Sequence, residues 1–427
     1  MKHFIGPFIN PISLDKVELI QKGRCTVDQH GTIHSFVEHD SVDDITDGTI
    51  IYASEGEFFM PGFVDTHTHA PQFSNIGKGM EYTLLDWLHN VTFPKEASFG
   101  KSHAETHEEH YQRVYDHYKE VVLEIIEHGT TTCCYFGSIH FEANIILAQV
   151  LKDLGQRALV GKTCMDANSP DYYIEATEES IENTRKFVHQ VRELGSGLVE
   201  PIITPRFAIS CSSKLMSELG SIAKELDVHI QSHLSETKPE IEFVKELFPA
   251  HDTYTAVYDN HELLTPKTVM AHCIWLEDEE IEILKSRNCG ISHCPNSNFN
   301  LRSGVFNVRR YLEAGMKVGL GTDVSGGSSV SIFDAMRQAI IASKVNHFQG
   351  GHSPLSAREA LFLATLGGSQ VLALDHKTGS FSPGKAFDAL VIKPKKYDNL
   401  AEALENTVFC GDKSFIQQAY CNGIKIY

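Results

Sequence analysis

Between residues 58 and 321 the sequence alternates short apolar runs with amphipathic helical patterns, and this alternation limits the possible folds more than any other feature. Strands that alternate with helices pair in parallel. Eight such strands favour a closed (β/α)8 barrel of the TIM type over an open doubly wound sheet. The expected strands cover residues 58–66, 130–136, 158–165, 199–203, 228–233, 268–272, 290–293 and 317–321. The expected helices cover residues 110–127, 143–154, 178–194, 214–226, 240–247, 277–286 and 308–314.

The two ends of the chain share a second pattern, in which short runs typical of strands are separated by Gly, Asp and Asn turns. Segments that flank a barrel in the sequence can pair with each other in space. We therefore expect a small discontinuous β-sandwich domain from residues 1–60 and 378–427, beside a catalytic barrel of residues 61–377. The expected strands of this domain cover residues 4–9, 17–22, 24–27, 33–38, 49–52, 389–392 and 418–427.

The net charge excludes some classes of partner. The 427 residues carry a formal charge of −19, whereas nucleic acids and anionic membranes are bound by clustered Lys and Arg. A small polar substrate is compatible with this charge. The first ten residues are too short for the apolar core of a signal peptide, and the ten cysteines form no C-x-x-C pair. We therefore expect a cytoplasmic protein with reduced thiols.

The run at residues 57–72 ends in two histidines separated by one residue, His67 and His69. Alternate side chains of a strand lie on one face, so the two imidazoles would converge on one point. Neutral imidazoles suit zinc, iron, copper or nickel, but two ligands alone do not hold a structural metal. An arbitrary pair of this kind is more often a pair of solvated side chains. The interpretation as a metal site therefore depends on further ligands elsewhere in the chain.

Further polar side chains stand at the ends of later strands, where (β/α)8 barrels carry their active sites. His233 ends the fifth expected strand, His272 ends the sixth, and Asp323 follows the eighth. His233 and Asp323 extend the histidine pair to three nitrogens and one oxygen, a set that leaves room for water as catalytic zinc sites require. Glu236 could move a proton between water and substrate, and His272 could hold the water. Each residue alone has a commoner structural explanation, but six at four strand ends are hard to explain in that way.

Several motifs together resemble the amidohydrolase superfamily, in its mononuclear deaminase branch. They are residues 61–69 (PGFVDTHTH), 229–236 (HIQSHLSE), 271–272 (AH) and 319–323 (GLGTD), with residues 383–389 (PGKAFDA) at the return into the small β domain. The resemblance extends over almost the whole chain. It implies one zinc ion per subunit, held by His67, His69, His233 and Asp323. It also implies a homodimer.

The catalytic residues implied by this resemblance are Glu236, His272 and Asp323. Lys162 could suggest a carbamate that bridges two metals, but it lies on the third expected strand. The related binuclear enzymes keep that lysine on the fourth strand, so one metal is expected.

Narrower features are similar to the guanine deaminases within this branch. They are Gln72, residues 84–88 (LLDWL), 92–94 (TFP), 161–166 (GKTCMD), 204–207 (TPRF) and 292–298 (SHCPNSN). The resemblance implies that Gln72 and Arg206 hold a purine. Their chemistry agrees, because Arg206 offers fixed donors for a carbonyl oxygen such as O6 and Gln72 offers both a donor and an acceptor. Phe207 and Trp87 could line the pocket, although plain packing explains both aromatics equally well.

The implied reaction is the hydrolytic deamination of guanine to xanthine and ammonia, a step of purine catabolism. Zinc would lower the pKa of bound water to about 7, and the hydroxide would attack C2. Glu236 would protonate the adjacent ring nitrogen, and Asp323 would take the proton from the water. The purine would also contact His69 and His233, together with Glu236 and Asp323. Residues 78–101, an insertion after the first strand, could cover the barrel mouth.

Other functions stay open. A deaminase of the same superfamily could act on another purine, a pyrimidine or a triazine. A catalytically silent barrel could serve as a binding scaffold, but it would be expected to lose ligands or the proton relay. The small zinc deaminase fold needs a Pro-Cys-x-x-Cys motif, which this sequence lacks. We expect a small-molecule substrate, and neither a nucleic acid nor a membrane as partner.

Overall fold

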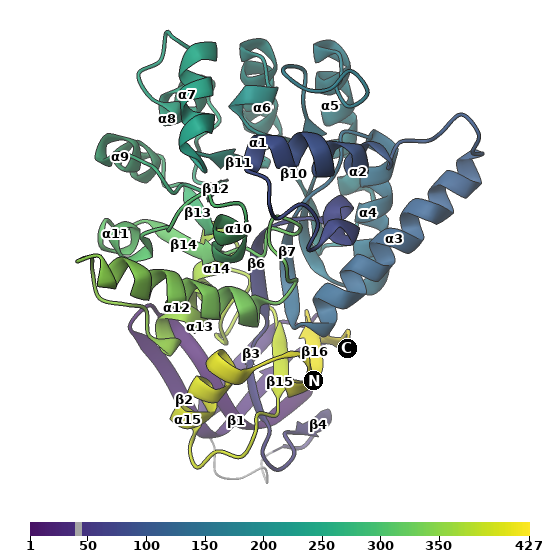
Figure 1. Ribbon diagram of the computed structural model, residues 1–427. Coiled ribbons are helices and arrows are strands. Elements are labelled where there is room, and N and C mark those ends of the chain that lie inside the picture. Colours follow the sequence, from purple (N-terminus) through teal and green to yellow (C-terminus); the bar gives the residue numbers. More distant parts are fainter. Residues whose placement is uncertain (39–44) are drawn as a thin grey trace.

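The computed structural model describes residues 1–38 and 45–427, and it contains the predicted barrel (Figure 1). Its strands run parallel, and each is hydrogen-bonded to the next. A two-residue strand, β9 (Thr163–Cys164), adds to the pairing of the fourth strand. The eight barrel strands are β6 (Phe63–His69), β7 (Thr130–Phe136), β8 (Arg157–Gly161), β10 (Val199–Pro205), β11 (His229–Leu234), β12 (Thr268–His272), β13 (Gly290–His293) and β14 (Lys317–Leu320).

The barrel closes where the end of β14 meets β6. The backbone N–H of Asp323 donates to the carbonyl of His67 at 2.9 Å, and the N–H of His69 donates to the carbonyl of Val324 at 3.1 Å. The Thr66 hydroxyl adds a bond of 2.9 Å to the carbonyl of Leu320. These bonds place the first and last strand ends side by side, so residues about 250 positions apart share one end of the barrel.

Helices surround the barrel strands (Figure 1). Several begin at capping boxes, as at Thr106 with Glu109 for α3 and at Thr237 with Glu240 for α7. The α-helices are α1 (Leu84–Trp87), α2 (Phe93–Ala97), α3 (His107–Glu127), α4 (Phe141–Leu154), α5 (Thr177–Glu193), α6 (Ser213–Leu226), α7 (Lys238–Leu247), α8 (Tyr254–Asn260), α9 (Asp278–Ser286), α10 (Pro295–Asn300), α11 (Val308–Glu313), α12 (Ile332–Phe348), α13 (Ala357–Leu363), α14 (Leu366–Val371) and α15 (Leu400–Cys410). The other helical turns are η1 (Ala70–Asn75), η2 (Leu88–Thr92), η3 (Ala208–Ser210) and η4 (Lys413–Phe415).

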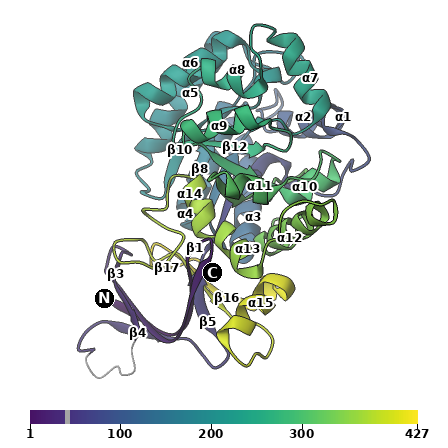
Figure 2. The same cartoon turned by 90° about the vertical axis from the view of Figure 1, so that its left-hand side faces the viewer.

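The second unit is a sheet built from both ends of the chain, as predicted (Figure 2). One hydrogen-bonded path runs β17-β16-β15-β5-β1-β2-β3, and β4 pairs with β1. Most neighbours are antiparallel, but β1 is parallel to β4 and β5. Aromatic side chains fill its core, with Phe4 stacked on Phe387 at 3.9 Å between ring centroids. The strands are β1 (Lys2–Ser13), β2 (Lys16–Val27), β3 (Ile33–Glu38), β4 (Thr49–Tyr52), β5 (Phe58–Pro61), β15 (Ala389–Ile392), β16 (Ile416–Cys421) and β17 (Ile424–Lys425).

The expected first barrel strand, residues 58–66, is in fact two strands in different sheets. β5 pairs with β15 in the terminal sheet, and β6 begins the barrel after Gly62. A Cβ on Gly62 would lie 2.0 Å from the Thr131 hydroxyl oxygen, so only glycine fits where the chain passes between the sheets. A continuous apolar run shows that both strands are buried, but it does not show a change of partner.

Four other expected strands are joined or divided in the structure. Residues 17–22 and 24–27 form one strand, β2, while residues 158–165 and 418–427 each divide into two.

Within the described ranges, no helix combines the length and the apolar character needed to cross a membrane. The division into domains at residues 60/61 and 377/378 stays a prediction.

A buried ion pair joins the barrel to the terminal sheet. Arg157, the first residue of β8, donates from Nε and Nη2 to the carboxylate of Asp388 at 2.8 and 3.1 Å. Asp388 directly precedes β15 and also accepts from the Thr378 hydroxyl and the Asn422 backbone N–H. Burial acts to raise the pKa of Asp388, but the Arg157 guanidinium outweighs it and holds the pKa below its ordinary value. The carboxylate is therefore charged, and each of its oxygens accepts two hydrogen bonds.

Replacing Asp388 with alanine should lower the free energy of unfolding by about 3–5 kcal/mol, because Arg157 would remain as a buried charge without its partner. Asp259→Ala is the matched control. Asp259 binds Arg287 through the same two nitrogens, at 2.7 and 3.0 Å, but the Arg287 side chain is 50% exposed against 7% for Arg157. Its loss should cost about 0–1 kcal/mol. Urea unfolding measures both values, and equal losses would contradict a dominant role for the buried pair.

Candidate active site

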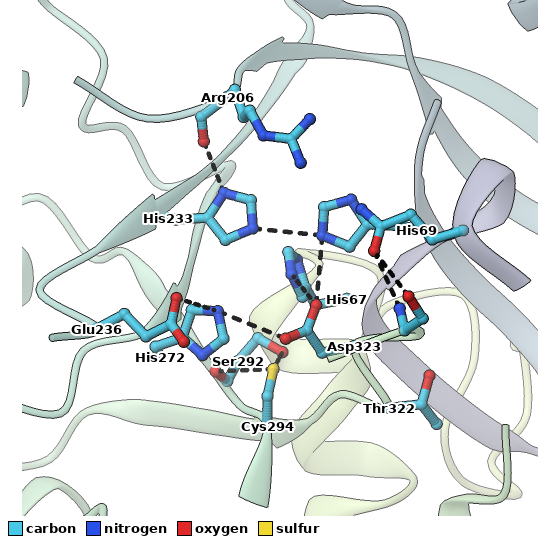
Figure 3. A network of polar contacts seen from close by, with 12 residues as sticks. His67, His69, Arg206, His233, Glu236, His272, Ser292, Cys294, Thr322 and Asp323 are labelled. Carbon is cyan, nitrogen blue, oxygen red and sulfur yellow. Dashed lines mark hydrogen bonds and ion pairs between the residues drawn. The ribbon is translucent and has the colours of Figure 1, made fainter. Parts of the chain in front are cut away.

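Polar side chains from four strands converge at one end of the barrel (Figure 3). His67 and His69 lie on β6, His233 lies on β11, His272 ends β12, and Asp323 follows β14. Candidate ligand atoms of His67, His233, His272 and Asp323 all lie within 4.8 Å of one another. His69 joins them, because its Nε2 lies 3.3 Å from both Asp323 Oδ1 and His233 Nε2. The structure thus brings together all the predicted metal ligands.

The state of these groups fits a metal cation. Neither ring nitrogen of His67 has a hydrogen-bond partner among the described residues, although its Nε2 lies 3.1 Å from Asp323 Oδ1. Burial lowers the pKa of His67 and His233, and it lowers the pKa of His69 to about 4. The imidazoles are therefore neutral near pH 7, which is the form that binds metals. Apart from the contact between His69 and His233, the buried lone pairs of these imidazoles receive no hydrogen bond from a donor group among the described residues. A metal cation between the rings would satisfy them.

Asp323 supplies the negative charge of this set. Burial acts to raise the pKa of its carboxyl group, but its contacts with His67 and His69 outweigh burial and hold the pKa well below the ordinary value. The backbone of Asp323 has φ +47°, and that of His272 has φ +70°. Residues other than glycine rarely adopt this left-handed conformation, and such strain is often kept at functional sites.

A backbone carbonyl fixes the ring of His233. Its Nδ1 lies 2.6 Å from the carbonyl oxygen of Arg206, which can only accept, so Nδ1 carries the proton. Nε2 is then left with its lone pair, facing His69 (Figure 3). Metal-binding histidines are commonly oriented by such an acceptor on the other ring nitrogen.

Glu236 and His272 lie together beside Asp323. Glu236 Oε2 lies 3.5 Å from His272 Nε2, while its Oε1 accepts from the Ser303 hydroxyl at 2.7 Å. His272 Nε2 lies 3.7 Å from Asp323 Oδ2, and its Nδ1 lies 2.9 Å from Asn298 Oδ1. Burial, and then the charge of Asp323, raise the pKa of Glu236 to about 8. Glu236 is therefore able to hold a proton near neutral pH, as a general acid must.

These groups open onto a cavity of about 390 Å³, including the part open to solvent. The predicted pocket aromatics, Trp87 and Phe207, both line it. Leu84 and Leu88 extend the lining, so the 78–101 insertion does cover this end of the barrel, with α1 and α2 lying across it (Figure 1). The remaining lining residues are His69, Gln72, Arg206, His233, Glu236, His272, Leu301 and Asp323.

Gln72 and Arg206, predicted from the sequence to hold the substrate, share a partner that sequence reasoning missed. Arg206 Nη1 donates to Glu96 Oε2 at 2.6 Å, and Gln72 Nε2 donates to Glu96 Oε1 at 2.7 Å. The Gln72 oxygen accepts from the backbone N–H and the hydroxyl of Ser325, at 3.1 and 3.3 Å. Gln72 therefore offers the cavity a donor only, whereas the sequence suggested both a donor and an acceptor.

Sequence reasoning also missed the positions of Ser303 and Asn298 beside Glu236 and His272. Asn298 closes one of the motifs carrying the family resemblance, so it could have been assigned to the site. Glu96 stands two residues after the Thr-Phe-Pro motif, but an isolated acid in a loop looks like any solvated charge. Lys162 is held away from the candidate metal ligands, because its Nζ bonds the Glu175 carboxylate at 2.7 Å.

Comparisons with known proteins agree with this geometry. Residues 58–424 match the model of the amidohydrolase family. The chain is 42% identical to a guanine deaminase of Dictyostelium discoideum, over 100% of this chain and 98% of the relative. It is 45% identical to a Homo sapiens guanine deaminase, over 87% and 84% of the two chains. The crystal structure of a guanine deaminase from C. acetobutylicum, with guanine bound in its active site, superposes with a TM-score of 0.92 at 38% identity over 100% of both chains.

Zinc-loaded protein freed of excess metal should contain about one metal ion per chain. His67→Ala and His233→Ala should lose most of this metal, because each removes one nitrogen of the set. His107→Ala is the control, since His107 is exposed at the start of α3, outside the barrel mouth. Elemental analysis by mass spectrometry gives the metal content without reference to activity. Full metal content in the His67 variant, or two ions in the wild type, would contradict the assignment.

Proposed function

The chain belongs to the amidohydrolase family, and on that premise we propose that it deaminates guanine by hydrolysis, giving xanthine and ammonia. The observation that carries the proposal is the convergence of the metal-ligand set, a proton carrier and two donor side chains on one cavity. Relatives that cover most of the chain are guanine deaminases. We further propose that the metal is zinc, with one ion per chain held by His67, His69, His233 and Asp323.

The substrate would lie in the cavity between the metal ligands and the 78–101 insertion, which we call the lid. Arg206 and Gln72 would donate to the far edge of the purine, while Phe207 and Trp87 would pack against its ring faces. His69, His233, Glu236 and Asp323 all line the cavity and would contact the end of the ring that reacts. This arrangement would direct C2 and its amino group toward the ligand set.

Zinc in this set would lower the pKa of a water molecule so that hydroxide is available near neutral pH. Asp323 would accept the proton that the water releases. His272, which lies 3.7 Å from Asp323 Oδ2, would steady the attacking oxygen. As the C2–O bond forms, Glu236 would protonate the ring nitrogen next to C2.

The second half of the reaction breaks the bond between C2 and its amino nitrogen. That nitrogen would leave as ammonia after taking up the proton held by Asp323, while the hydroxyl proton on C2 would return to Glu236 and the oxygen would stay on C2 as the carbonyl of xanthine. Ser303 holds Oε1 of Glu236, so Oε2 is the oxygen placed to carry protons toward the ring. The lid would keep bulk water away from these proton transfers.

The homodimer and the cytoplasmic location expected from the sequence stay predictions.

An experiment separates guanine from the alternative substrates. Zinc-loaded protein is incubated with guanine, adenine, cytosine and guanosine, and ammonia and the ultraviolet spectrum are followed. Guanine should release ammonia as the spectrum changes to that of xanthine. Turnover of another base with no ammonia from guanine would overturn the proposed substrate.

Glu236→Gln should lower kcat by about 10²–10⁴-fold while the metal content stays at the wild-type value, because the amide keeps the shape but cannot deliver a proton. Glu242→Gln is the matched control. Glu242 lies on α7, six residues further on, with its side chain 68% exposed and bonded to Lys245. Its activity should equal that of the wild type. Wild-type turnover in Glu236→Gln would remove Glu236 from the proton relay.

A further inference from the structure

Helix α2 of the lid places a buried carboxylate against both residues proposed to hold the substrate. Glu96 is fully buried and accepts hydrogen bonds from Gln72 at 2.7 Å, from Arg206 at 2.6 Å and from the Tyr173 hydroxyl at 2.7 Å. Phe93, one turn earlier on α2, lies under the Arg206 guanidinium at 5.1 Å. Two side chains of one short helix therefore set the position of Arg206.

These contacts leave Gln72 only one amide orientation. The Glu96 carboxylate can only accept hydrogen bonds, and the Ser325 backbone N–H can only donate. The Gln72 nitrogen must therefore face Glu96 while its oxygen faces Ser325. The opposite orientation would place oxygen against carboxylate and N–H against N–H. Because the Ser325 hydroxyl also donates to that oxygen, the amide has only an N–H left for the cavity.

The charge of Glu96 makes this arrangement independent of pH near neutrality. Burial acts to raise the pKa of Glu96, but the Arg206 guanidinium, with help from the Tyr173 hydroxyl, outweighs it and holds the pKa below its ordinary value. Glu96 is thus an anion without a proton to donate. It cannot release Gln72 by becoming a donor itself.

We infer that Glu96 is a positioning residue that sets substrate specificity, because it fixes Gln72 and Arg206 so that this wall of the cavity presents N–H donors. A wall of donors selects purines with a carbonyl at C6 over purines with an amino group at C6. With C2 directed at the metal ligands, the far edge of the ring carries N7 and the C6 substituent. In guanine O6 and N7 both accept hydrogen bonds from such a wall. In a 6-aminopurine N7 still accepts, but the amino group at C6 is a donor that faces the N–H donors of the wall.

This inference rests on the proposed function and adds the basis of its selectivity. A site whose buried donors are left unpaired rejects the wrong ligand far more strongly than an apolar pocket does. The suitable pair of substrates is guanine and 2,6-diaminopurine. Both carry the amino group at C2 that is hydrolysed, and they differ in the group at C6 and in the proton on N1 that goes with it. The change in the ratio of their kcat/KM values between the wild type and a variant of the wall therefore measures the contribution of the wall, because the difference in reactivity at C2 is common to both proteins.

Glu96→Gln should lower kcat/KM for guanine by about 10- to 100-fold, mainly through KM. It should also reduce the guanine to 2,6-diaminopurine ratio at least about tenfold, because an amide in place of the carboxylate no longer requires a donor from Gln72, so that Ser325 alone holds the Gln72 amide. Metal content should not change. Glu105→Gln is the matched control: it breaks another two-point pair, with Arg113 at 2.6 and 3.1 Å, on the surface, and both quantities should stay at wild-type values.

An unchanged ratio in Glu96→Gln, even with lower activity on both substrates, would overturn the inference. If that variant loses metal or fails to fold, the wild-type protein decides. Hypoxanthine has a carbonyl at C6 and adenine has an amino group there, and neither carries an amino group at C2. Hypoxanthine should inhibit at concentrations at least about 100-fold lower than adenine, and equal inhibition would overturn the donor wall. Failure of the proposed function is distinct, because the wild type would then release no ammonia from guanine.

Discussion

The hydrogen bonds that join β6 to the end of β14 are the constraint on which the rest of the site depends. Besides the two backbone bonds, the buried Asp65 carboxylate accepts from the backbone N–H groups of His67 and Thr322, both at 3.1 Å, and from the Thr322 hydroxyl at 2.5 Å. One carboxylate therefore aligns the histidine pair with Asp323. The ligand set exists only when the barrel is closed, so metal binding would stabilise the folded chain.

Arg206 links the proposed metal site to the proposed substrate site. Its carbonyl accepts from the His233 ring, and its guanidinium is held by Glu96 and Phe93 of the lid. A shift of this one residue would change both the orientation of His233, a proposed metal ligand, and the donors that line the cavity. The lid accordingly has two roles, since it covers the cavity and also holds the Arg206 guanidinium in position.

The sequence alone predicted the barrel, because each strand is a short apolar run and the helices between them have clear periodicity. The strands at residues 268–272 and 290–293 have the expected limits. The passage between sheets at Gly62 was not predictable, since β5 and β6 are both fully buried. Glu96 was missed because its partner Arg206 lies 110 residues away and only the fold brings the two together. Histidines at strand ends can be assigned to a site from their position in the sequence. A residue that acts by holding other side chains can be assigned only from its contacts in the folded chain.

We propose that the closed barrel holds one metal ion by three imidazoles and one carboxylate. X-ray absorption spectroscopy at the zinc edge of the zinc-loaded wild type tests it most directly. The spectrum should show only nitrogen and oxygen ligands, at about 2.0–2.2 Å, with the outer-shell scattering of about three imidazole rings. A sulfur ligand at about 2.3 Å, or the scattering of fewer than two imidazoles, would contradict it.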